Sequence, residues 1–189
     1  MRRLIQTVLL SAFVVVPVAR ADDTAKPPAE AQPKPPPALV DAFKGMTGTW
    51  ACKGKFQNMD GSGKMMDSKS TMVLKSALDG FAYSGDYRVE KNAVLPDGMK
   101  GQMFWSYDAA TTKLVEFYAD SVGGLGHGTS EGLKGDTVVW DEDGVMMGKA
   151  NKSRTTMKRV SSHEITLTSE MPAPDGKWAT VGSDTCKKQ

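Results

Sequence analysis

The chain has 189 residues, a length that predicts a single domain with at most a terminal tail. Its formal net charge is +2, but residues 1–21 hold three arginines and no acids, so the rest of the chain carries −1. A chain this close to neutral lacks the basic surplus of nucleic-acid-binding proteins, and we predict no nucleic-acid partner.

The N-terminus has the pattern of a secretory signal peptide. A positive start is followed by the apolar run Leu4 to Val18 and by Ala19-Arg20-Ala21, which fits the small-x-small rule for cleavage. The run is too short and too poorly flanked for a stable spanning helix. We predict cleavage after Ala21, a 1–21 signal peptide, and export to the periplasm or the outside of a bacterium with no transmembrane segment after processing.

Residues 22–37 are predicted to be a disordered linker, because they are rich in proline and hold nothing bulky and apolar to bury. A proline-rich recognition site is the alternative for this segment. Leu39, Val40 and Phe43 then share one face of a short helix that Gly45 can end. So short a helix must dock to persist, and we expect it to cap one end of a sheet or barrel.

From Gly48 onward, strand-like runs alternate with turn signals such as Asp-Gly and Pro-Asp-Gly. Connections this short make neighbouring strands antiparallel. The predicted strands are Thr49–Gln57, Met65–Ala77, Phe81–Glu90, Gln102–Asp108, Lys113–Asp120, His127–Gly132, Asp136–Glu142, Val145–Val160 (one strand or two), Glu164–Met171 and Lys177–Cys186.

These runs predict an all-β fold over residues 38–189, a single antiparallel up-and-down barrel of about ten strands. Closure removes the two exposed edges that a flat sheet would leave, and a sandwich is the alternative. Along Lys113–Asp120 the residues Leu114, Glu116 and Tyr118 share one face and Phe117 lies on the other. A face that mixes apolar and polar residues favours a partly polar cavity, and a barrel of this size encloses packed side chains or one small ligand.

The two cysteines, Cys52 and Cys186, lie near the two ends of the predicted barrel. In an oxidising compartment such a pair is commonly a disulfide, which would place the first strand beside the last. A free redox pair is the alternative, although the chain has no Cys-x-x-Cys.

Several motifs, taken in order, carry a family resemblance. Gly48-x-Trp50 resembles the Gly-x-Trp opening of the lipocalin-like superfamily. The motifs that follow resemble the bacterial lipocalin-like family catalogued as domain of unknown function 1579: Trp105-Ser106-Tyr107-Asp108, Lys113-Leu114-Val115, Asp120-Ser121, Gly132, Arg154 and Pro174-Asp175-Gly176-Lys177. The resemblance spans Met46 to Lys187 and implies a ten-stranded, lipocalin- or nitrobindin-like barrel with no settled activity. Family members commonly end in a Tyr-x-Arg-like segment, whereas Thr185-Cys186-Lys187 here fits a secreted branch with an added disulfide.

Five residues are candidates for ligand binding, each with a plainer alternative. Trp105 and Trp140 could stack on an aromatic ligand or pack the core, and Tyr118 shares the mixed face of its strand. His127 lies among glycines that let a ligand approach closely, or it is a polar residue near the rim. Arg154 could anchor an anionic group inside the barrel, or it is a solvated strand charge.

No catalytic residue and no metal site are predicted. The sequence holds no Gly-x-Ser-x-Gly, no P-loop and no dinucleotide fingerprint. Two separated histidines do not make a metal site, and the pairs Met65-Met66 and Met146-Met147 suit a flexible lining better than a Cu(I) clamp, because adjacent strand residues point to opposite faces. A haem is conceivable because nitrobindins use a histidine as the iron ligand, but their motif is not matched, so we predict no cofactor.

We predict from these observations a monomeric barrel that binds a small hydrophobic or amphipathic molecule in its cavity, without catalysis. One alternative is an enzyme, a hydrolase or isomerase, in which His127, Glu170 and Arg154 meet in the cavity. The other is a structural or interaction module of the envelope, with a dry, closed interior and an exposed apolar patch.

Overall fold

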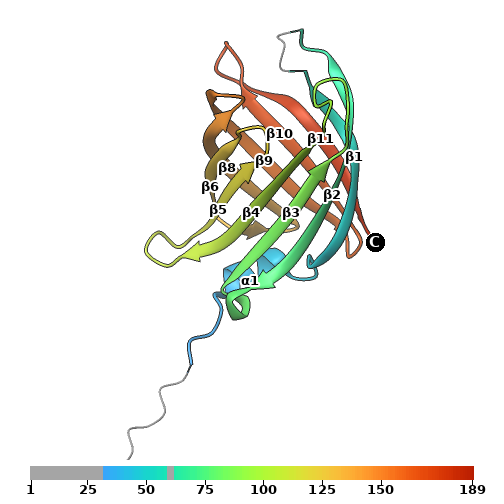
Figure 1. Ribbon diagram of the computed structural model, residues 1–189. Coiled ribbons are helices and arrows are strands. Elements are labelled where there is room, and N and C mark those ends of the chain that lie inside the picture. The colour runs from blue at the N-terminus through green and yellow to red at the C-terminus, as the bar shows by residue number, and fades with distance from the viewer. Residues whose placement is uncertain (1–31, 59–61) are drawn as a thin grey trace, which may run out of the picture. The chain divides into compact units, whose positions relative to one another are not determined.

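The computed structural model describes residues 32–58 and 62–189, and strands dominate this part of the chain (Figure 1). The predicted signal peptide and most of the predicted linker lie outside the described residues. The elements are α1 (Pro37–Phe43), β1 (Gly48–Gln57), β2 (Met65–Ala77), η1 (Leu78–Gly80), β3 (Ala82–Val89), β4 (Met99–Asp108), β5 (Lys113–Asp120), β6 (Leu125–Ser130), β7 (Leu133–Lys134), β8 (Thr137–Met146), β9 (Lys149–Ser161), β10 (Glu164–Pro172) and β11 (Trp178–Lys188). None of the helices within these ranges has the length and apolarity needed to cross a membrane.

The strands form one closed antiparallel barrel. Neighbours along the chain pair with each other from β1 to β6 and from β8 to β11, and the pairs β1–β11 and β6–β8 close the sheet. The two-residue β7 pairs only with β8, so ten strands form the wall. This confirms the predicted up-and-down barrel and excludes the sandwich.

Burial alternates along the strands, as expected for a wall with one covered face. In β5, Leu114 and Glu116 are buried whereas Phe117 is 55% exposed. The face that mixes apolar and polar residues is therefore the inner one, and the more apolar face of this strand points outward. The inner face of β5 therefore carries a buried acid among the mostly apolar residues of the core.

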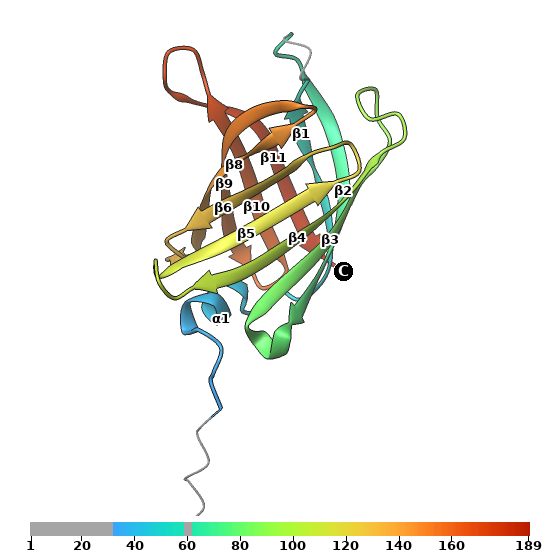
Figure 2. The same ribbon diagram turned by 60° about the vertical axis from the view of Figure 1, so that its left-hand side comes forward.

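Helix α1 covers one end of the barrel, in agreement with the prediction (Figure 2). Its Phe43 stacks on Tyr83 at 4.5 Å between ring centroids and contacts Trp105 at 5.2 Å. All three side chains are buried, so the helix contributes its apolar face to the barrel core. Among the described residues, no helix covers the other end of the barrel, where the β10–β11 connection lies (Figure 1).

Hydrogen bonds fix the chain that follows α1. Arg159 Nη2 donates to the carbonyls of Asp41 and Ala42 at 2.7 and 2.6 Å, which satisfies acceptors that a helix end leaves open. Trp50 Nε1 donates to the carbonyl of Met46 at 2.7 Å, and Trp50 is fully buried. The Gly-x-Trp motif thus ties the first strand to the end of the helix.

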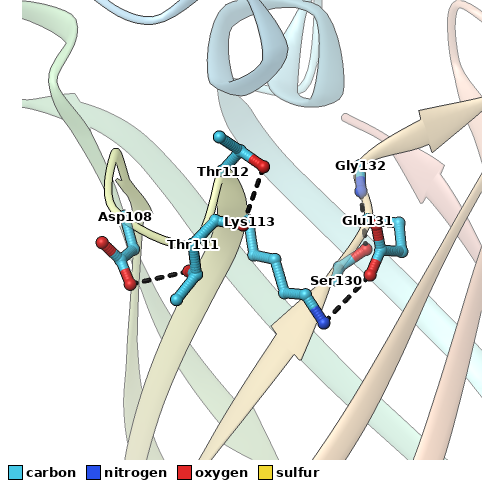
Figure 3. Close-up of polar contacts among 7 residues, drawn as sticks. All are labelled: Asp108, Thr111, Thr112, Lys113, Ser130, Glu131 and Gly132. Atoms are coloured by element: carbon cyan, nitrogen blue, oxygen red, sulfur yellow. Dashed lines mark hydrogen bonds and ion pairs between the residues drawn. The ribbon is translucent and has the colours of Figure 1, made fainter.

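The β4–β5 turn and the end of β6 lie side by side near α1 (Figure 3). Asp108 accepts from the Thr111 hydroxyl at 2.7 Å, which shapes the turn and lowers the pKa of the Asp108 carboxyl. Lys113 forms an ion pair with Glu131 at 3.0 Å. These contacts are exposed, so they define local geometry and contribute little to stability.

The break expected between the predicted strands 136–142 and 145–160 is not formed. Gly144 lies inside β8, and the turn is made by Met147 and Gly148 with φ of 49° and 76°. A Cβ on Gly144 would lie 2.5 Å from the Tyr118 hydroxyl, and one on Gly126 would meet the same side chain at 2.5 Å. These glycines provide space for the Tyr118 ring rather than a turn.

The predicted disulfide is confirmed. Cys52 in β1 and Cys186 in β11 are directly paired across the two strands that close the barrel, and they are bonded to each other. Both side chains are buried, so the bond joins the first and last strands from inside the barrel.

Reduction of this disulfide should lower the free energy of unfolding by up to about 4–5 kcal/mol, because it releases a loop spanning 134 residues in the unfolded chain. Urea unfolding with and without a reductant measures the difference. The double variant Cys52→Ala/Cys186→Ala should resemble the reduced protein and should not respond to the reductant. An unfolding midpoint that reduction leaves unchanged would contradict this account.

Candidate functional site

The barrel encloses a cavity of about 130 Å³ between the α1 end and its middle. Apolar side chains dominate the lining, among them Trp105, Trp140 and Met103. Two carboxyl groups, Glu116 and Glu142, complete it, and none of the described residues that line it is Lys, Arg or His. An apolar pocket with a few convergent polar groups is the usual form of a small-molecule site.

Glu116 is the most unusual of these lining residues, because it is only 1% exposed. Its neighbour across the β4–β5 ladder is Trp105, and the indole Nε1 donates to Glu116 Oε2 at 2.9 Å. The other oxygen, Oε1, has no hydrogen-bond partner among the described residues. A buried carboxyl with one unsatisfied oxygen is energetically costly, so it requires an explanation.

A second carboxyl, that of Glu142, lies across Gly128 from Glu116. The register places Glu116 of β5 and Glu142 of β8 on either side of Gly128 in β6, with both side chains on the inner face. A Cβ on Gly128 would lie 2.6 Å from Glu116 Oε1, so only glycine at this position leaves room for the Glu116 carboxyl. Ser153, opposite Glu142 in β9, orients the second carboxyl by donating to its Oε2 at 2.6 Å.

The electrostatics of this pair favour a proton on Glu116. Burial raises the pKa of Glu116 to about 8, the charge of Glu142 and a hydrogen bond to its carboxyl raise it as well, and the bond from Trp105 opposes the shift. Glu116 is therefore mainly protonated at neutral pH and can donate to Glu142, which relieves the unsatisfied oxygen. Burial and the nearby acids, first Glu142 and then Glu116, also raise the pKa of Tyr118 to about 12.

Three of the five predicted ligand-binding residues face the interior. Trp105 and Trp140 are 5% exposed and line the cavity. Tyr118 is half-buried and lies above it, over Gly126 and Gly144. The structure therefore brings these three side chains to one side of the same interior.

His127 and Arg154 lie on the outer face. His127 is exposed, because its neighbours in β6, Gly126 and Gly128, face inward. Arg154 pairs with Asp141 at 2.8 Å, and its guanidinium lies 4.5 Å from the centre of the Trp178 ring. Neither side chain reaches the cavity.

The enzymatic arrangement considered from sequence is therefore not formed. It required His127, Glu170 and Arg154 to meet in the cavity, but His127 and Arg154 are outside the barrel and Glu170 is the register partner of Arg154. The sequence left this alternative open because His127 stands between glycines, which carry no inside-or-outside signal.

The sequence-based analysis missed the pair Glu116 and Glu142. One signal was present, since Glu116 alternates with Leu114 and Tyr118 on the mixed face of β5. The meeting with Glu142 depends on the register across Gly128, which no local pattern contains. Within residues 32–58 and 62–189, no three His, Cys, Asp or Glu side chains are grouped to hold a metal ion.

A comparison with known protein families assigns the chain to one of them. The family model described as "Protein of unknown function (DUF1579)" matches residues 38–187. The chain belongs to the DUF1579 family. This match agrees with the resemblance found in the motifs and covers the whole barrel. No curated protein matches the sequence significantly.

Solved structures show that the DUF1579 barrel occurs in other proteins. The crystal structure of Rv2717c from M. tuberculosis has a TM-score of 0.57 and 13% identity, with 82% of this chain and 99% of that chain covered. The S-type phycobiliprotein lyase CPES from Guillardia theta has a TM-score of 0.50 and 11% identity, with 80% and 92% covered. At this identity the likeness shows a common fold.

The raised pKa of Glu116 predicts a pH-dependent stability. The folded state holds the proton more tightly than the unfolded state, so stability should fall as pH rises from about 4.5 to about 8. Glu116→Gln keeps an acceptor for Trp105 and removes the charge. The free energy of unfolding of this variant should equal that of the native protein near pH 4.5. Above pH 8 it should be higher by roughly a few kcal/mol.

Urea unfolding of both proteins between pH 4 and pH 9 measures this difference. Glu131→Gln is the matched control, since Glu131 is exposed and Lys113 lowers the pKa of its carboxyl. The difference in free energy of unfolding between this control variant and the native protein should change only slightly with pH, and in the opposite direction. Parallel stability curves for the native protein and Glu116→Gln would show that Glu116 titrates normally.

Proposed function

We propose that this DUF1579 barrel is an exported protein that binds one small apolar or amphipathic molecule in its interior. The observation that supports this most directly is the cavity of about 130 Å³ with Glu116 in its wall. A purely structural core would be more stable with an apolar or amide side chain at this position, because a buried carboxyl must be desolvated. Its presence in the lining of an apolar space fits recognition better than packing.

The cavity volume limits the ligand. A 150 Å³ apolar cavity in another protein holds benzene, so about 130 Å³ suits one ring or the ring end of a larger amphipathic molecule. Met72, Met103 and Met157 line the space, and the flexible methionine side chain can adapt to a guest. Because α1 covers one end, the ligand would enter from the other (Figure 2).

The alternative of an interaction module explains a different part of the molecule. Phe117 and Leu125, on the adjacent strands β5 and β6, are 55% and 57% exposed and would suit a partner surface. That function gives no role to the cavity or to the buried carboxyl of Glu116 in its wall. A phycobiliprotein lyase has the same barrel fold, which is compatible with an interior used for binding.

Toluene should bind the purified protein at a single saturable site and raise its melting temperature, as any ligand specific to the folded state does. Leu167→Trp should abolish this shift by filling the cavity that Leu167 lines, with Leu167→Phe as a milder variant. Val139→Trp is the control, because it adds a large side chain at an exposed position of the wall. Failure of toluene to bind, or binding that the cavity-filling variants leave unchanged, would refute an interior site.

Export is the second part of the proposal, and the buried disulfide supports it, since such bonds persist mainly in oxidising compartments. When the full chain is expressed in a Gram-negative bacterium, the periplasmic fraction should contain a form that begins at Asp22. Intact-mass measurement identifies this terminus. Ala21→Arg should block the processing, and an unprocessed protein confined to the cytoplasm would contradict export.

A further inference from the structure

We propose that the ligand is a small organic cation whose ammonium group lies between Glu116 and Glu142, while its apolar part packs against Trp105 and Trp140. This inference rests on the proposed binding function and adds the charge class of the ligand. It follows from the sign of the interior, the placement of the two carboxyls and the aromatic lining.

The sign of the cavity excludes the anionic amphiphiles that barrels could also bind. Its two ionisable lining residues, Glu116 and Glu142, are both acids, and no lining residue among those described is a base. An anionic ligand such as a carboxylate would lose its hydration and meet two carboxyl groups without a compensating charge. A cation of similar size would instead find two carboxyl groups that can compensate its charge.

The placement of the acceptors matches an ammonium group. Trp105 donates to Glu116 Oε2 at 2.9 Å, and no amine, amide or hydroxyl of the described residues donates to Oε1. Ser153 holds the carboxyl of Glu142 in place at 2.6 Å, and Gly128 leaves room for the carboxyl of Glu116 on the inner face. An ammonium has three donors and no acceptor, so it can donate to both carboxyls through charge-assisted bonds.

The rest of the cavity suits the rest of such a molecule. Trp105 and Trp140 are both buried and lie on the lining, and the indole face is the aromatic surface that attracts cations most strongly. Since the cavity is close to the size of one ring, benzylamine, a ring with one methylene and an ammonium, is a suitable probe. Long-chain amines would have to extend past Tyr118 toward the open end.

Binding of a cation should also displace a proton. Glu142 of β8 and Tyr118 of β5 face Glu116, and Asp120 and Asp143 lie farther out, where they act on Tyr118. Without a ligand, burial and the neighbouring acid keep Glu116 protonated. A bound ammonium favours the carboxylate instead, so each binding event near pH 7 should release part of one proton.

The test compares four molecules of similar shape on the protein from Asp22 to Gln189: benzylamine, benzyl alcohol, toluene and benzoate. Isothermal titration calorimetry should show benzylamine binding at least about tenfold more tightly than benzyl alcohol or toluene, and benzoate not binding. Titrations in two buffers with different ionisation enthalpies should reveal the released proton. Equal affinity for benzylamine and toluene would overturn the cation inference while leaving interior binding intact, whereas no binding by any of the four would overturn both.

Two variants locate the charge effect. Glu116→Gln conserves side-chain volume and the acceptor for Trp105. It should lower the affinity for benzylamine at least about tenfold and leave the affinity for toluene unchanged. If Glu116→Gln does not fold, Glu142→Gln tests the site in the same way by removing the charge of the second carboxyl. Glu131→Gln, exposed and outside the barrel cavity, is the control and should change neither affinity. A folded Glu116→Gln or Glu142→Gln protein that binds benzylamine with unchanged affinity would refute the site.

Discussion

The large side chains inside this barrel depend on glycines in the neighbouring strands. The Trp105 ring lies 2.9 Å from where a Cβ of Gly85 would be, and the Glu116 carboxyl lies 2.6 Å from that of Gly128. The wall is narrow, so a bulky residue on one strand requires that its neighbour present no side chain. Trp105 and Glu116 both line the cavity, so the glycines beside them help to decide where its lining can lie.

The same arrangement explains how the fold tolerates a buried acid. At the α1 end, Phe43 and Trp50 pack into a closed apolar core, and the disulfide Cys52–Cys186 joins the strands that complete the ring. This end supplies stability that does not involve Glu116. A carboxyl that costs free energy can persist where the surrounding structure is fixed by other interactions, and such residues commonly mark functional sites.

The sequence alone allowed the barrel, the capping helix and the disulfide to be predicted, because strand alternation, short turns and two widely spaced cysteines each have one dominant structural meaning. Glycine has two meanings in a barrel, a bend or a place for a neighbour's side chain, and Gly144 was assigned the wrong one. For the same reason, the sequence did not show whether His127 faces the inside or the outside of the barrel, since glycines flank it in β6. The Glu116–Glu142 pair was beyond reach, because it arises from the register of strands that are distant in sequence.

The carboxyl pair also suggests a physical relation between the ligand-free barrel and the proposed ligand-bound one. A proton on Glu116 and a cation beside it solve the same electrostatic problem, the presence of two carboxyls in a space from which water is largely removed. The proton on Glu116 meets this need when the cavity is empty, and in the proposed complex an ammonium group meets it instead. A neutral or anionic guest offers no such exchange. In the proposed complex, the cation therefore takes the role that the proton on Glu116 has when no ligand is bound.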